Sequence, residues 1–394
     1  MPSGSTPGQD QRGRFVRREN RFVATVARVD GELVRAYLPN TARLKDLLRP
    51  GVEVVLAPNA AAHRRTAWTL TRVWDGTWVS LEASGAATLV ADHLASGATL
   101  PAWPAVVEVH REVTVGAHRF DLELILDGGE RALVEVKSLS GARQRAAPLS
   151  ATPSARGAAQ LGALGRLAGA GHRVAVVLVV QRGDVDVLDL TAEADPGWRA
   201  AVVAARQAGV HLVAYRCRVT PTSVDLDRRL PIRDRPPDQL AEVYLDSLIE
   251  LELASGTTTI RARQDGATPG HLPRGLPPGT RHLHVITACN PYSAPLSART
   301  NDERNRLLAA ELATRGLPAG AARGRSPDGT WQEPGFAVLD GDPAQVLDLA
   351  WRFEQHAVYE LTGDHLAVVW TAPDHPPVRR GWQLAGPRPP TSGP

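Results

Sequence analysis

The first eighty residues of the chain alternate between apolar and polar positions in short runs. Alternation of this kind, broken by turn residues such as Asp30-Gly31, is typical of β-strands joined by hairpins. Segment 38–51, LPNTARLKDLLRPG, predicts a capped turn or a short helix. We expect a small barrel over 15–81, after a disordered polar tail at 1–14. The predicted strands are FVATVARV (22–29), ELVRAYL (32–38), VEVVLA (52–57), TAWTLTRVW (66–74) and TWVSLE (77–82).

Residues 82–235 mix helical and strand patterns. VAVVLVV (174–180) is apolar at every position, as in a central strand buried on both faces. Leu161, Leu164 and Leu167 recur at helical spacing. The pattern predicts an α/β domain. Its further expected elements are helices near 86–96, at 156–169 and at 197–208, and strands at Glu108–Val115, FDLELIL (120–126), ALVEVKSL (132–139) and HLVAYRCRV (211–219).

A segment rich in proline and charge, PIRDRPPD (231–238), predicts a linker to a third domain at 236–394. This domain again mixes patterns, so we expect an α+β fold within a multi-domain α/β protein. The tail after Trp382 is expected to be loose. The predicted helices are QLAEVYLDSLIELELA (239–254), NDERNRLLAAELATRG (301–316) and PAQVLDLAWRFEQ (343–355), and the predicted strands are RHLHVITA (281–288), GFAVLD (335–340) and HLAVVW (365–370).

Length and composition indicate how many domains the chain has and in which compartment it is expected. A chain of 394 residues predicts two or three domains, and its apolar positions form no run long enough to cross a bilayer. The N-terminal segment lacks the apolar stretch of a secretory signal. Cys217 and Cys289 lie far apart, as expected of free thiols in a reducing compartment. We therefore expect a cytoplasmic protein without a membrane partner.

Charge is distributed unevenly along the chain. Residues 1–80 carry 13 basic and 7 acidic side chains, whereas residues 236–394 carry 14 and 18. A polyanion is thus drawn to the N-terminal barrel, whose five short strands suit the oligonucleotide-binding (OB) kind. Phe22, Tyr37 and Trp68 suit either base stacking or a core. The basic side chains expected to contact nucleic acid there are Arg17, Arg18, Arg21, Arg43, Lys45 and Arg49.

Lysine is rare: of 45 basic residues only Lys45 and Lys137 are lysines. A chain that uses arginine almost everywhere keeps a lysine where a compact ammonium is needed, for instance to orient a water. Lys137 follows Glu135 by two positions, so both side chains share one face of a strand, and Val134 and Val136 face a core.

A turn at Asp127-Gly128-Gly129 folds the preceding strand back and brings Asp121 beside Glu135. Two carboxylates and a backbone carbonyl suit Mg²⁺, or Mn²⁺, which binds oxygen ligands and keeps several waters. Glu112, or less favourably Glu108, is an upstream carboxylate that adds to the set. The alternative is a solvated strand face, because a short acidic motif is common. The scarcity of lysine, the apolar strand and the turn favour the functional interpretation.

An ordered set of phrases resembles the bacterial and archaeal sugar fermentation stimulation protein family over about 15–232. The phrases are RENRFVATV, YLPNTARLKDLLRPG, RFDLELIL, ALVEVKS and HRVAVVLVVQRGDVDVLDL. The resemblance implies an N-terminal OB barrel, a restriction-endonuclease-like domain and DNA binding. It also implies that Asp121, Glu135 and Lys137 match a D…E-x-K nuclease motif and that Glu112 matches an upstream glutamate.

The chain departs from that family after the motif strand. The segment LSATPSARGAAQL keeps Arg156 and Gly157, but Ala151 stands where an aspartate is expected and Gln160 where a histidine is expected. Ala42 replaces a glycine. Arg156 joins the residues expected to contact nucleic acid. The sequence favours a Mg²⁺-dependent nuclease acting on DNA or RNA, and the departures favour a non-catalytic DNA-binding transcriptional regulator.

The third domain carries fewer signals. His282 and His284 share a strand face, but no third metal ligand follows at a convincing spacing, so core or surface histidines are the favoured interpretation. Asn290-Pro291 and Glu333-Pro334 suit turns. The segments ITACNPYSAPLS and WQEPGF resemble an uncharacterised bacterial domain family. The acidic balance of 236–394 is compatible with a protein partner.

Overall fold

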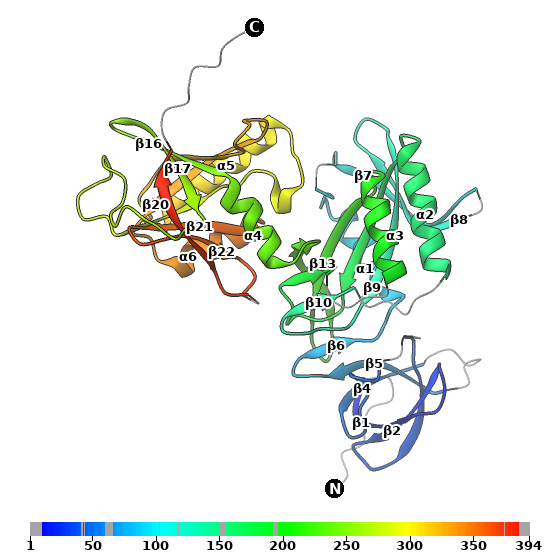
Figure 1. Ribbon diagram of the computed structural model, residues 1–394. Helices are drawn as coiled ribbons and strands as arrows, with labels where there is room; N and C mark the ends of the chain where they lie inside the picture. The colour runs from blue at the N-terminus through cyan, green and yellow to red at the C-terminus, as the bar shows by residue number, and fades with distance from the viewer. Residues whose placement is uncertain are drawn as a thin grey trace. The chain divides into compact units, whose positions relative to one another are not determined.

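The structure is a computed structural model, which describes residues 10–40, 42, 44–59, 66–101, 103–116, 118–149, 155–191, 196–373 and 375–385. The chain divides into two compact units, Met1–Ile232 and Arg233–Pro394 (Figure 1). The first unit holds the predicted barrel and the predicted α/β domain. Among the described residues, no helix is both long and apolar enough to cross a bilayer.

The N-terminal barrel is closed by five strands. They are β1 (Gln11–Arg18), β2 (Val23–Arg28), β3 (Leu33–Tyr37), β4 (Glu53–Pro58) and β5 (Trp68–Trp74). Their order is β3-β2-β1-β4-β5, and a parallel pairing of β3 with β5 completes the ring. β6 (Trp78–Ser80) extends β5 as a hairpin. Phe15, Val26, Leu56 and Leu70 are buried in the barrel core, which confirms the predicted OB architecture.

Two sequence expectations for this region need correction. Residues 11–14, assigned to a disordered tail, belong to β1, which pairs with both β2 and β4. A Cβ at Gly13 would lie 2.7 Å from Val26 Cγ1, so this glycine permits close strand packing. Segment 77–82, expected as the fifth barrel strand, forms β6 outside the ring. Segment 38–51 forms a turn in its described part, where the amides of Leu47 and Leu48 bond to the Leu44 carbonyl.

The α/β domain is built on a mixed sheet of the order β14-β13-β11-β9-β8-β7. β9 and β13 both run parallel to β11, whereas β7, β8 and β14 join through antiparallel pairs. The strands are β7 (Val106–Val115), β8 (His118–Leu126), β9 (Arg131–Leu139), β11 (Arg173–Val180), β13 (His211–Val219) and β14 (Val224–Leu230). A small second sheet has the order β10 (Ala146–Pro148), β12 (Val187–Asp189), β15 (Ile232–Arg233).

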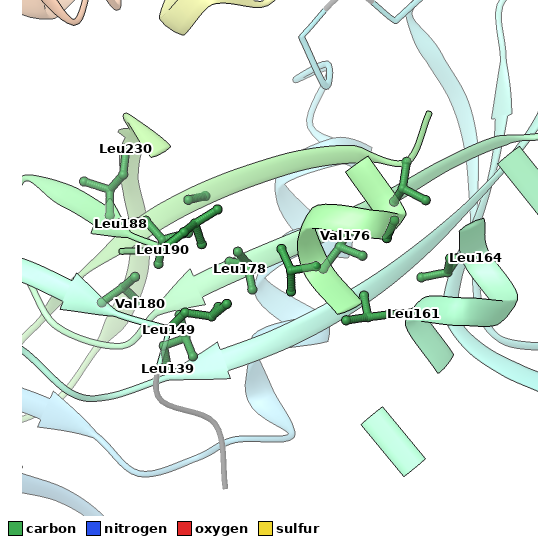
Figure 2. Packing of buried hydrophobic residues seen from close by; sticks show 14 of the residues in the cluster. Leu139, Leu149, Leu161, Leu164, Val176, Leu178, Val180, Leu188, Leu190 and Leu230 are labelled. Carbon is green, nitrogen blue, oxygen red and sulfur yellow. The ribbon is translucent and has the colours of Figure 1, made fainter. Parts of the chain in front are cut away.

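Helices cover both faces of the mixed sheet, so two cores form. α1 (Gly85–Ala95) packs with Leu122, Val134 and Val136 on one face. α2 (Ala155–Gly169) and α3 (Pro196–Gln207) pack on the other, where Leu161 and Leu164 contact alternate residues of the central strands (Figure 2). The predicted helices, the central strand and the inward direction of both valines are confirmed.

The barrel joins the sheet through its last hairpin. The amide of Ser80 bonds to the carbonyl of Gln181 at 2.9 Å, just after β11. The buried Arg182 pairs with Asp184 and reaches Asp75 in the β5–β6 turn at 3.1 Å. Hydrogen bonds and the pairing with both aspartates raise the pKa of Arg182 against its burial. The hairpin therefore lies at the carboxyl ends of β11 and of β9, the strand that carries Glu135 and Lys137.

The C-terminal unit is an α+β domain built around a closed eight-stranded barrel in its described part. The order is β16-β17-β23-β22-β21-β18-β20-β19, closed by pairing of β19 with β16. The strands are β16 (Leu248–Leu253), β17 (Gly256–Arg263), β18 (His282–Ile286), β19 (Ala319–Arg325), β20 (Gln332–Leu339), β21 (Ala357–Thr362), β22 (Leu366–Trp370) and β23 (Val378–Leu384). The helices are α4 (Pro237–Asp246), the short η1 (Pro291–Ser293), α5 (Ala298–Thr314) and α6 (Pro343–Arg352).

The sequence predicted α5 and α6 but not the barrel. Segment 239–254, expected as one helix, is α4 followed by β16, because Ile249 and Leu251 alternate into the barrel core while the chain pairs on both sides. The last strand is β23 and not β22, so residues 383 and 384 belong to a strand. Both cysteines are buried and free, as expected.

Candidate functional site

The turn after β8 brings the two acidic residues of the motif, Asp121 and Glu135, onto neighbouring strands. β8 and β9 pair antiparallel with Leu122 opposite Val134, a register that places Asp121 beside Glu135 one step further along. The Oδ2 atom of Asp121 accepts a hydrogen bond of 2.7 Å from the backbone amide of Val136. This amide lies between the motif glutamate and the motif lysine, so the aspartate is fixed against the motif strand.

Glu135 and Lys137 form a close ion pair on the same face of β9. The Nζ atom of Lys137 lies 2.5 Å from Glu135 Oε1. The glutamate side chain is only 4% exposed, whereas the lysine side chain is 24% exposed. Removal of a carboxylate from water is costly unless a cation compensates it. The pair therefore holds a buried negative charge beside an ammonium that water still reaches.

Gln160 on α2 is a third member of this cluster that sequence reasoning counted only as a departure. Its Oε1 atom accepts a 3.0 Å hydrogen bond from Lys137 Nζ. An ammonium has three donors, and the glutamate and the glutamine use two of them. Gln160 thus positions the lysine. Within the described residues, one N–H of the Lys137 ammonium remains to donate to a water or a phosphate oxygen. The helical spacing of α2 gave no signal of this contact.

Glu112 occupies a different environment. It lies on β7 with a positive φ of 58°, between the pairs that join Arg111 to Leu122 and Val113 to Phe120. Its carboxylate is 67% exposed and forms an ion pair with Arg119. Glu108, also on β7, pairs with His110 at 3.1 Å. The register thus places Glu112 opposite Asp121 on the neighbouring strand, but its carboxylate pairs with Arg119 and that of Glu108 with His110, so neither joins the Glu135–Lys137 ion pair.

The donor set at Asp121 and Glu135 consists of carboxylate oxygens, the ligand type that hard divalent cations prefer. Among the described residues, no group of three or more His, Cys, Asp and Glu side chains is arranged to hold a metal ion. Mg²⁺ commonly uses one or two carboxylates and completes its shell with waters and phosphate oxygens. The two carboxylates of Asp121 and Glu135 are compatible in chemical type with that mode of binding.

Several basic residues of the barrel are exposed. Arg17 on β1 and Lys45 in the turn between β3 and β4 make no ion pair within the described residues. Arg21 lies over the ring of Phe22, with 5.6 Å between the guanidinium carbon and the ring centroid, and Phe22 is 47% exposed. An exposed aromatic ring beside a guanidinium is a surface on which a base can stack.

Other basic residues already have partners. Arg18 donates to the backbone carbonyls of Ala42 and Arg21 at 2.7 and 2.8 Å and so braces the loops around β1. Arg49 pairs with Asp75 at 2.8 Å. Tyr37 and Trp68 are partly buried, and Trp68 packs against the barrel core. The side chains of Arg43, Ala151 and Arg156 lie outside the described residues.

Comparison with known proteins identifies both parts of the first unit. The model described as "Sugar fermentation stimulation protein RE domain" matches residues 85–223, and "SfsA N-terminal OB domain" matches residues 16–81. A sugar fermentation stimulation protein homolog of Chloroflexus aurantiacus is 36% identical over 219 residues, which cover 55% of this chain and 83% of the homolog. The chain belongs to the sugar fermentation stimulation protein family.

Further comparisons agree with this membership. A family member from Alkaliphilus metalliredigens is 34% identical over 227 residues, 57% of this chain and 97% of the homolog. A solved structure, Pyrococcus furiosus SfsA in complex with Ca²⁺, matches with a TM-score of 0.50 and 24% identity over 57% of this chain and 96% of its own. Residues 286–358 match a separate family described only as a protein of unknown function. The first unit therefore has the family's OB and restriction-endonuclease-like fold, and the matched family domains end before the C-terminal unit.

Within the C-terminal unit the two histidines flagged by the sequence have local partners. The Nε2 atom of His284 lies 3.7 Å from Glu360, which also contacts His365 at 2.7 Å. Burial lowers the pKa of His284, although Glu360 opposes the shift. His282 contacts the Gly341 carbonyl at 3.1 Å. These contacts suit residues that join barrel strands, as the favoured interpretation held.

Proposed function

We propose that this family member is a divalent-metal-dependent nuclease that hydrolyses phosphodiester bonds in DNA, with RNA as a second substrate. The observation that carries the proposal is the cluster on neighbouring strands: Asp121 tied to the Val136 amide, and Glu135 paired with the one lysine of the domain. Mg²⁺ or Mn²⁺ is the proposed cofactor. The Ca²⁺ in the Pyrococcus furiosus relative supports this choice, since Ca²⁺ is also a hard cation that takes oxygen ligands.

Each residue has a distinct role in the proposal. Asp121 and Glu135 would hold the ion, and the chemistry that it would supply when bound is to polarise the phosphodiester and lower the pKa of a water. Lys137 orients that water or a phosphate oxygen through its remaining donor, and Gln160 keeps the ammonium over the site. Glu135 also compensates the lysine charge in the absence of nucleic acid.

In this proposal the N-terminal barrel binds the nucleic acid. Arg17, Lys45 and the Arg21–Phe22 pair offer positive charge and a stacking surface. The β5–β6 hairpin connects the barrel to the carboxyl ends of β9 and β11 through Arg182. Nucleic acid held on the barrel is thereby bound by the same unit that carries the acidic cluster.

The second candidate function is a non-catalytic DNA-binding regulator. One observation favours it. Lys137 already contacts Glu135 and Gln160, and Gln160 stands at the position where the family resemblance leads one to expect a histidine. In that case the cluster is a buried structural ion pair, and only the barrel's binding surface acts.

Incubation of the purified chain with labelled single- and double-stranded DNA and RNA distinguishes the two functions. We expect products in Mg²⁺ or Mn²⁺ and none in chelator. Binding without cleavage on every substrate would establish the regulator and reject the nuclease. The Glu135→Gln variant is the control for a contaminating nuclease, because it keeps the shape of the side chain and removes its charge.

A further inference from the structure

The C-terminal barrel contains a cavity of about 620 Å³ that no part of the proposed nuclease uses. It is lined by α4, by the ends of β18, β20 and β21, and by the loop after β18, all within one compact unit. This volume is in the range of small-molecule sites, which span roughly 300–1,000 Å³. Much of the wall is apolar or aromatic, with Tyr244, Ile286, Trp331 and Tyr359 among the lining residues.

Glu333 is a carboxyl group in this mostly apolar wall. Asn290 Nδ2 donates to its Oε1 atom at 2.7 Å, and the indole of Trp331 also hydrogen-bonds to it. Both partners are neutral. Burial therefore raises the pKa of Glu333 to about 7, against the effect of these two hydrogen bonds. A carboxyl group without a cationic partner is costly to bury, so its presence in a cavity wall points to a ligand that compensates it.

The loop that carries Asn290 is held in a strained conformation. Asn290, Tyr292 and Ser293 all have positive φ, at 44°, 48° and 60°. Such outliers cost about 1–3 kcal/mol each and occur preferentially where a binding site requires them. Here the strain directs the Asn290 amide at Glu333 and places the Tyr292 ring against His356, with 5.3 Å between centroids.

A second layer of asparagines fixes this loop. Asn301 Nδ2 donates to Asn290 Oδ1 at 2.9 Å, and Asn301 Oδ1 accepts a hydrogen bond of 2.9 Å from the backbone N–H of Asn290. Asn305, one turn later on α5, bonds to the Ala288 amide and to the Pro334 carbonyl, next to Glu333. A rigid support of this kind is typical of a binding site whose polar groups need fixed positions.

Charge identifies the class of ligand. No lysine or arginine lines the cavity in the described residues, whereas Glu333 and Asp246 do. A phosphate or carboxylate would meet no cation there and would face acidic oxygens. The aromatic walls favour a flat apolar body, and Glu333 accepts hydrogen bonds from N–H donors.

We propose that this cavity binds a phosphate-free small molecule with a flat aromatic body, whose amine, amidine or ring N–H group donates to Glu333. Most of the wall, including Glu333, lies in residues 286–358, which match the family of unknown function, whereas α4 lies outside that match. The site does not depend on nuclease activity. Asn290 and Trp331 orient the carboxyl group, and Tyr359 is held by its hydroxyl bond of 2.8 Å to the Tyr244 carbonyl.

Three matched probes test the proposal on the full chain by isothermal titration or ligand-observed NMR: benzamidine, benzamide and benzoate. They share one ring but present a cationic donor pair, a neutral amide and an anion. We expect benzamidine to bind with a Kd on the order of 1 mM or tighter, benzamide more weakly, and benzoate not at all. No binding of any probe at about 10 mM, or benzoate binding as well as benzamidine, would overturn the proposal.

Three variants locate the site. Glu333→Gln keeps an acceptor for Asn290 and should weaken benzamidine binding at least about tenfold. Val243→Trp, at a 47% exposed position of α4 that lines the cavity, should block it without disturbing the core. Glu252→Gln, an exposed position on β16 outside the cavity, is the matched control and should bind like wild type. Wild-type affinity in both of the first two variants, with near-ultraviolet circular dichroism unchanged, would show that the cavity is not the site.

The pH dependence adds an independent readout. Benzamidine affinity should rise between pH 5.5 and 8.5 as Glu333 ionises, and Glu333→Gln should remove that rise. The other titratable groups facing Glu333 or the cavity are Tyr244, Tyr359, Cys289, His356 and Asp246. Burial raises the pKa of both tyrosines and of the cysteine, so they stay neutral over this range. A rise of equal size in wild type and variant would contradict the role of Glu333.

Discussion

Glu135 in the mixed sheet is buried and Glu333 in the wall of the C-terminal cavity is half-buried, and their neighbours differ. Glu135 has an ammonium 2.5 Å away, whereas Glu333 has an asparagine amide and an indole. A cationic partner keeps a buried carboxylate ionised, while neutral donors only partly offset desolvation. The comparison indicates that the charge of the neighbouring group, more than the degree of burial, determines which kind of ligand such a glutamate can bind.

The two sites accordingly suit different ligands. In the proposed function, the charged cluster of Asp121, Glu135 and Lys137 suits a divalent cation and a phosphodiester, because carboxylates and an ammonium lie together there and water still reaches Lys137. The cavity around Glu333 suits an uncharged or cationic aromatic molecule. Variants that affect one site should leave the other intact, which makes each a control for its counterpart.

The largest expected effect is on cleavage. Glu135→Gln or Asp121→Asn removes a proposed metal ligand and should reduce metal-dependent cleavage at least about 1,000-fold, while affinity for DNA changes little. Glu333→Gln should cleave at the wild-type rate. Single-turnover assays with labelled DNA, combined with filter binding, measure both quantities. Equal cleavage by Glu135→Gln and wild type would remove the catalytic assignment of the cluster.

Lys137→Arg tests the cluster more finely. The guanidinium keeps the charge but is planar, broader and unable to trade a proton, so cleavage should fall about 100-fold. Gln160→Ala should produce a smaller loss, since it removes only the group that positions the ammonium. The measurement is the pH–rate profile in Mg²⁺. If Lys137→Arg retains the wild-type rate, the compact ammonium has no role in the reaction.

The effect of Glu333 on stability has a defined pH window. Its pKa is about 7 in the folded chain and about 4.5 in the unfolded chain, so its contribution to stability is fully present below pH 4.5 and is lost as pH rises through 7. Glu333→Gln should therefore raise the unfolding free energy of the C-terminal unit above pH 7 by on the order of 2 kcal/mol, with allowance for solvent screening. Hydrogen exchange of peptides from β18 and β20 at pH 5 and pH 8 measures the difference. A gain of the same size at pH 5 would argue against a raised pKa.

Much of the first unit could be predicted because its patterns are local. Alternating strands and the Asp30-Gly31 turn define most of the barrel, and the i, i+2 rule places Glu135 and Lys137 on one face. β1 was not predicted as a strand, and its first four residues were assigned to the tail, because arginines occupy its outward positions. Gln160 was missed as a contact because it reaches the lysine from a helix more than twenty residues away.

The C-terminal barrel was harder to predict. Its short strands are paired over long sequence separations, and the last part of the expected first helix is β16. The sequence offered one signal of the cavity, the Asn290-Pro291 and Glu333-Pro334 pairs, which suited turns. Their functional potential depends on a 2.7 Å contact between side chains 43 positions apart. No local pattern reports such a contact.

The smallest expected effect is on nucleic-acid binding by the N-terminal barrel, a function that is not proposed for the Glu333 cavity. Arg17→Ala and Lys45→Ala remove exposed charges of the N-terminal barrel, and each should weaken DNA affinity severalfold at every sequence. Each should also reduce the slope of log K against log salt by roughly 0.9, because one fewer phosphate is neutralised. Arg12→Ala is the matched control, since this 57% exposed arginine is already paired with Glu53 at 2.8 Å and should change the slope less. Filter binding between about 50 and 200 mM salt supplies the slopes. A slope that is unchanged in both test variants would place the nucleic acid on another surface of the chain.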